Sequence, residues 1–138
     1  MVDKKLEENI RKAEDLIEIW DKFHRIFERA VSKGQVGSDG EEEFVSVRNL
    51  VSSRYEDLMD SMGVKPLRRF IVGSHVYNIL SLDKLSIMSD EKQKAVEDDW
   101  RLSGEFLGSL RDRLKRKKKR IEGFNRFWLL AKRKIQNK

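Results

Sequence analysis

Two adjacent apolar seams in the first 32 residues constrain the fold more than any other feature of the chain. In each seam the apolar residues recur at intervals of three and four, which is the spacing of one face of an α-helix. Two seams are wider than a two-stranded coiled coil needs, so the pattern predicts a long helix over about 3–32 that packs against two neighbours. The first seam contains Leu6, Ile10, Ala13, Ile17, Trp20, His24, Phe27 and Val31, and the second contains Leu16, Ile19, Phe23, Ile26 and Ala30.

The rest of the chain also favours helices, because it has only one proline and eight glycines to interrupt them. We predict a second helix between a loop at 34–40 and Gly63, a third with Pro66 in its first turn, and a fourth opened by a capping box at Asp90 and Gln93. The inner face of the third helix is expected to contain Leu67, Phe70, Ile71, Ser74, Tyr77 and either Leu80 or Ser81. The apolar stripe of the fourth is expected to contain Val96, Trp100, Ser103, Leu107, Leu110 and Leu114. The fold class is therefore all-α, an elongated bundle of four to five helices with a long N-terminal helix and a basic C-terminal helical extension.

Charge divides the chain into an acidic body and a basic end. Residues 1–110 carry a net charge of −5, whereas residues 111–138 carry +11. Within residues 115–120 every side chain is charged, so this stretch has no apolar face to bury in a core. We assign residues 1–114 to the body and 115–138 to a basic, aromatic C-terminal helical segment, which is part of the same domain or an extension of it.

The basic end is the predicted binding element, and several partners fit it. Its cations suit the phosphates of a nucleic acid, with nearby aromatic rings to stack on bases. A basic amphipathic helix also fits an anionic membrane surface or the groove of a partner protein. Without any ligand, the run is a solvated helix end or pairs with acidic residues at 41–43 or 97–99. We expect the aromatic segment to fold back and complete its own bundle, because three large aromatic side chains left exposed would favour aggregation. The candidate residues for binding an anion or a partner are Arg111, Arg113, Lys115, Arg116, Lys117, Lys118, Lys119, Arg120, Arg126 and Trp128.

The two histidines are the only conventional general bases. His24 lies on the first seam and is expected to be a hydrogen-bonded interface residue. His75 follows Arg69 with five residues between them, and this spacing resembles the Arg-x4-6-His element of the HEPN helical ribonucleases. The resemblance implies that arginine and histidine flank a scissile phosphate. A HEPN-like ribonuclease acting through Arg69 and His75 is therefore a distant alternative function.

Other catalytic and cofactor chemistries lack the residues they need. The chain contains no cysteine, no Glu-x-x-His pair, no Walker A sequence and no EF-hand loop, so we predict no catalytic residue, no metal and no cofactor. We expect a non-enzymatic helical interaction or scaffold protein, with nucleic-acid binding through 111–120 as the alternative. A charged N-terminus favours the cytoplasm. The long two-seamed helix favours a homodimer.

Overall fold

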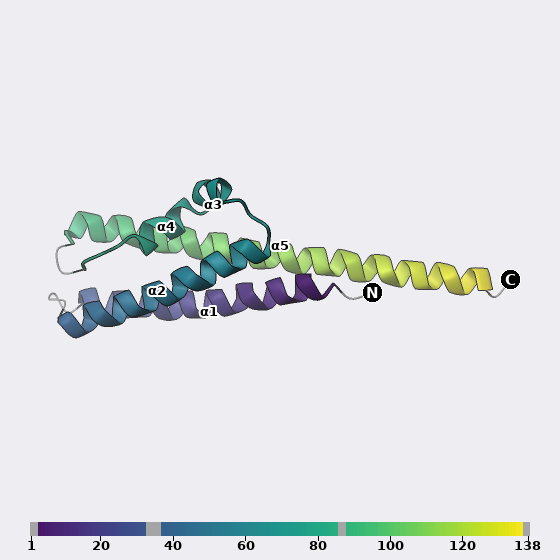
Figure 1. The fold of residues 1–138 in the computed structure, drawn as a ribbon, viewed down its shortest axis with the longest axis horizontal. Helices are drawn as coiled ribbons and strands as arrows, with labels where there is room; N and C mark the ends of the chain where they lie inside the picture. Colours follow the sequence, from purple (N-terminus) through teal and green to yellow (C-terminus); the bar gives the residue numbers. More distant parts are fainter. Residues whose placement is uncertain (1–2, 33–36, 86–87, 137–138) are drawn as a thin grey trace.

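The computed structural model describes residues 3–32, 37–85 and 88–136, and these residues form five helices without a strand. The three long helices lie side by side, with α1 antiparallel to both α2 and α5 (Figure 1). The short α4 packs on α5, and α3 stands at the edge of the bundle. This arrangement confirms the predicted elongated all-α bundle. The helices are α1 (Lys4–Ser32), α2 (Ser38–Ser61), α3 (Pro66–Val72), α4 (Ser74–Leu80) and α5 (Asp90–Gln136).

An aromatic cluster at the centre of the bundle joins α1 to α5. The ring of Trp100 lies 4.8 Å from that of Trp20 and 4.7 Å from that of Phe23, measured between centroids. Both tryptophans are buried, as predicted for Trp20 from the first seam and for Trp100 from the apolar stripe of the fourth predicted helix. Aromatic pairs at these separations contribute packing energy beyond the burial of their area. The cluster therefore fixes α1 against α5 at mid-length.

Helix boundaries follow local sequence signals, with one displacement. Gly63 adopts φ 71° directly after the C-terminus of α2, and Pro66 occupies the first turn of α3, as predicted. The predicted capping box at Asp90 is wrong by one residue. The hydroxyl of Ser89 instead accepts a hydrogen bond of 3.1 Å from the backbone N–H of Lys92, so Ser89 caps α5.

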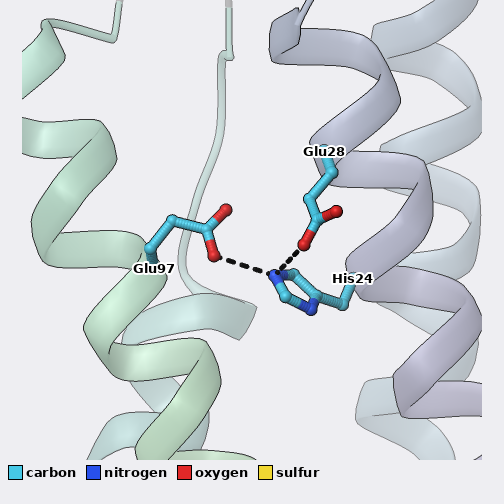
Figure 2. A group of neighbouring side chains, drawn as sticks. All are labelled: His24, Glu28 and Glu97. Carbon is cyan, nitrogen blue, oxygen red and sulfur yellow. Dashed lines mark hydrogen bonds and ion pairs between the residues drawn. The ribbon is translucent and has the colours of Figure 1, made fainter.

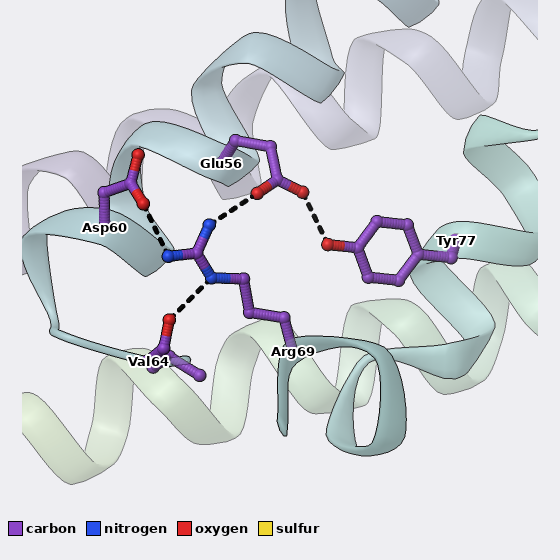
Figure 3. Close-up of polar contacts among 5 residues, drawn as sticks. All are labelled: Glu56, Asp60, Val64, Arg69 and Tyr77. Carbon is purple, nitrogen blue, oxygen red and sulfur yellow. Dashed lines mark hydrogen bonds and ion pairs between the residues drawn. The ribbon is translucent and has the colours of Figure 1, made fainter. Parts of the chain in front are cut away.

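The predicted buried face of the third helix is wrong in its first half, whereas Tyr77 and Leu80 in its second half pack against the core. The helix is interrupted at Gly73, and in α3 the side chains of Leu67, Phe70 and Ile71 are exposed. A polar contact explains this exposure: the side chain of Arg69 points toward α2, where its guanidinium donates hydrogen bonds to Glu56 and Asp60 (Figure 3). Since the arginine holds this face of α3 against α2, the apolar residues on the other faces are turned toward solvent.

The corner between α3 and α4 requires glycine. A Cβ built on Gly73 would lie 2.1 Å from the hydroxyl oxygen of buried Tyr55 and 3.0 Å from the carbonyl of Arg69. Those distances leave no room for a side chain unless the tyrosine moves. Gly73 therefore permits the close packing of this corner on α2.

The C-terminal segment does not fold back. α5 runs without a break from Asp90 to Gln136 and extends past the N-terminal end of α1 (Figure 1). Fold-back would need a turn near Gly123, but that glycine lies inside the helix. Within the three described ranges, no helix is long and apolar enough to cross a membrane.

Candidate interaction surface on the C-terminal half of α5

The C-terminal half of α5 begins beside α1 and ends without a neighbouring helix. Leu114 is buried and Ile121 is half-buried against the core, whereas large apolar side chains from Phe124 to Leu130 are exposed. At 1.5 Å per residue, the 47 residues of α5 span about 70 Å, against about 44 Å for the 29 residues of α1. The surplus length of α5 thus forms a projection.

Two lysines of the basic run are tied to α1. The ammonium of Lys115 lies 3.8 Å from a carboxylate oxygen of Glu14, and that of Lys118 lies 3.5 Å from Glu7. The basic run therefore lies beside α1 at these two lysines. The predicted acidic partners at 41–43 and 97–99 are wrong, because the antiparallel register brings the start of α1 to this part of α5.

Five other cations face a groove. The groove measures about 730 Å³ and has an apolar floor made by Met62, Leu110 and Leu114. None of its cations forms an ion pair or a hydrogen bond with the described part of the chain, and all five are exposed. Their charges are consequently available to an anionic partner. These cations are Arg113, Arg116, Lys117, Lys119 and Arg120.

A stripe along α5 joins this basic region to an aromatic region. Arg113, Lys117 and Arg120 recur at intervals of four and three, and Phe124, Phe127 and Ala131 continue the same series. Residues with this spacing lie on one face of a helix. The ring of Trp128 packs edge-on against Phe124 at 5.9 Å on the same side. We call residues Arg113, Lys117, Arg120, Phe124, Phe127, Trp128 and Ala131 the α5 stripe.

The remaining sequence candidates lie at the margins of the α5 stripe. Arg111 pairs with its neighbour Asp112 at 3.1 Å, so its charge is partly engaged. Arg126 is exposed and lines a second groove that also contains Leu6 and Leu129. Leu129 is a further exposed apolar residue that no sequence pattern marks as a binding candidate. Only its exposure identifies it, since a leucine in a helix ordinarily indicates a core position.

Arg69 and His75 bind to different helices. Arg69 donates hydrogen bonds to Glu56 at 2.7 Å and to the carbonyl of Val64 at 2.6 Å (Figure 3). The Nδ1 atom of His75 instead lies 2.8 Å from Asp99 of α5. The guanidinium of Arg69 is thus paired with carboxylates of α2, and the imidazole of His75 with a carboxylate of α5. In this arrangement the two residues link α3 and α4 to the rest of the bundle.

Tyr77 completes the network around Arg69. Its hydroxyl donates to the second oxygen of Glu56, so one carboxylate links α3, α2 and α4. Burial, together with this hydrogen bond, raises the pKa of Tyr77 to about 12. Its hydroxyl thus stays protonated at neutral pH and acts as a structural donor.

Comparison with known proteins gives no relative: no protein-family model, curated protein or solved structure matches this chain. The chemistry of the α5 stripe and of the grooves beside it is therefore the basis for assigning a function.

Proposed function

We propose that this protein is a non-enzymatic interaction protein that binds a partner protein through the α5 stripe. The observation that carries this proposal is the exposure of five large apolar side chains on a helix that projects beyond its bundle. Their exposed fractions lie between 59% and 66%. These residues are Phe124, Phe127, Trp128, Leu129 and Leu130.

The three aromatic residues of the α5 stripe form one exposed apolar patch on the projection. With about 200 Å² per aromatic side chain, three residues exposed by roughly 60% present on the order of 360 Å². The largest apolar patch of a typical monomer measures about 300–600 Å² and often has a function. A specific interface buries about 800 Å² per partner, so this patch would supply part of one side, and the flanking cations and leucines would supply the rest.

A second copy of the chain is one partner that this surface would accept. The large apolar residues of α1 are all buried or half-buried by α2 and α5, so α1 offers little surface for a dimer. A homodimer would therefore use the aromatic projection. We expect a dimeric mass in sedimentation at micromolar concentration, and a monomeric mass when Phe124, Phe127 and Trp128 are changed to Ser.

The proposal is tested by affinity capture from the native cell with three baits. The first is the wild type, the second carries Phe124→Ser, Phe127→Ser and Trp128→Ser, and the third carries Leu67→Ser and Phe70→Ser on α3. The third bait is a matched control, because it removes exposed apolar residues elsewhere. In nuclease-treated lysate, we expect the first and third baits to capture the same partner protein and the second bait to fail to capture it. Equal capture by all three baits would contradict the proposal.

Nucleic-acid binding is the second candidate, and it is favoured by the five groove cations, which have no partner among the residues that the structure describes. A matched pair of variants tests it at physiological ionic strength. Lys117→Gln with Arg120→Gln removes two groove cations, whereas Lys115→Gln with Lys118→Gln removes two lysines paired with α1. We expect the first variant to bind single-stranded RNA several-fold more weakly and to lower the salt slope by about 1.4, at about 0.7 per phosphate contact. Equal RNA affinities of the two variants would exclude the groove as the RNA-binding site.

An anionic membrane surface remains an alternative partner for the same stripe. Binding of the wild type to anionic vesicles, lost in the aromatic variant and absent with neutral vesicles, would favour it. A cytoplasmic location stays a prediction of the sequence.

A further inference from the structure

We propose that His24, Glu28 and Glu97 form a binding site for a divalent transition-metal ion, with Zn²⁺ as the ion that fits the donor set best. The site lies between α1, which supplies the first two residues, and α5, which supplies the third (Figure 2). It is separate from the α5 stripe and does not depend on the function proposed above.

Two carboxylates converge on one imidazole nitrogen. The Nε2 atom of His24 lies 2.9 Å from Oε2 of Glu97 and 3.0 Å from Oε1 of Glu28. A neutral imidazole carries a single N–H, so it can donate a well-aligned hydrogen bond to only one of these oxygens. A cation placed between the three atoms would instead satisfy both carboxylates and the nitrogen lone pair.

The distances suit a metal ion. All three donor atoms lie within 4.8 Å of one another. Tetrahedral Zn²⁺, with bonds of about 2.0–2.2 Å, places its ligand atoms roughly 3.3–3.6 Å apart. The separations of 2.9 and 3.0 Å from Nε2 of His24 are shorter than this by roughly 0.3–0.7 Å. Because both carboxylates are partly exposed, small rotations of their side chains would adjust all three separations. The remaining coordination position would be taken by water.

The fold holds the histidine in place. The imidazole of His24 stacks on the buried ring of Trp100, with centroids 4.8 Å apart and planes 26° apart. His24 and Glu28 are one turn apart on α1, so their positions are fixed by the helix itself. An imidazole with two carboxylates is a donor set for Zn²⁺ and similar ions, whereas Mg²⁺ prefers oxygen ligands and keeps its waters.

Calorimetric titration of the full chain with ZnCl₂ and MgCl₂ tests the proposal. The chain has two histidines and no cysteine, so imidazole binding can come from only two positions. His75→Asn is the matched control, because His75 pairs with the single carboxylate of Asp99. We expect one Zn²⁺ per chain in the wild type and in His75→Asn, bound at least tenfold more tightly than Mg²⁺. His24→Asn and Glu97→Gln should weaken Zn²⁺ binding at least tenfold.

A second readout protects the test against loss of folding. Zn²⁺ should raise the Tm of the wild type, because an ion bound only by the folded state stabilises it. Glu28→Gln, at a half-exposed carboxylate, should retain the wild-type Tm without metal and lose most of this rise. The proposal is overturned if His24→Asn binds Zn²⁺ as the wild type does, if His75→Asn loses the binding, or if Zn²⁺ and Mg²⁺ bind equally weakly.

Discussion

Replacing Trp100 by Ala should remove much of the stability of the bundle. The residue is only 2% exposed, and its ring touches the rings of Trp20, Phe23 and Phe27. A buried aromatic side chain covers about 150–250 Å², which corresponds to roughly 4–6 kcal/mol at about 25 cal/mol per Å². Because the surrounding residues relax partly into the cavity, the expected loss of unfolding free energy is about 3–5 kcal/mol. The total unfolding free energy of a domain is about 5–15 kcal/mol.

Trp128→Ala is the matched control, because it is the same substitution on the same helix. Trp128 is 59% exposed, so the expected change in unfolding free energy is within about 0.5 kcal/mol. Urea denaturation followed by far-UV circular dichroism measures both variants without relying on tryptophan fluorescence. Similar losses for the two variants would refute the reasoning, since the projection would then be packed as tightly as the core.

Three further predictions concern the corner between α2, α3 and α4. Gly73→Ala should destabilise the protein by about 1–3 kcal/mol through overpacking. The loss should be clearly smaller in a Tyr55→Phe background, because the tyrosine oxygen is the nearest clashing atom. Equal losses in the two backgrounds of this double-mutant cycle would contradict the contact. The pKa of Tyr77 is raised to about 12 from about 10 in the unfolded chain, so the residue stabilises the folded state fully below pH 10 and less as the pH rises toward 12. Urea titrations should therefore show a smaller fall in the unfolding free energy over this pH range for Tyr77→Phe than for the wild type. Arg69→Ala should speed hydrogen exchange at the α3 amides while leaving α1 unchanged, and unchanged exchange in α3 would contradict the anchoring role.

Local sequence determined the helices of the body and most of their ends. The two seams of α1 repeat with the helical period, and so do Val96, Trp100, Ser103 and Leu107 at the start of α5, so the burial of Trp20 and Trp100 follows from periodicity alone. Gly63 and Pro66 act on their own backbone, which is why the end of α2 and the start of α3 were predictable. The exposure of most of the basic run also follows from sequence, because six consecutive charged residues have no apolar face.

Tertiary structure decided which apolar residues are buried and which charges are paired. Phe70 and Phe124 both have the spacing of a core face, yet both are exposed. Phe70 is turned toward solvent because Arg69 holds the opposite face of α3 against α2, and Phe124 is exposed because α5 is longer than the helices beside it. Neither cause is local. The convergence of Glu97 on His24 is likewise invisible in sequence, because these residues are 73 positions apart and meet only through the antiparallel register of α1 and α5. The periodicity of a sequence predicts which face of a helix is apolar. Whether another helix covers that face depends on the lengths and registers of the neighbouring helices.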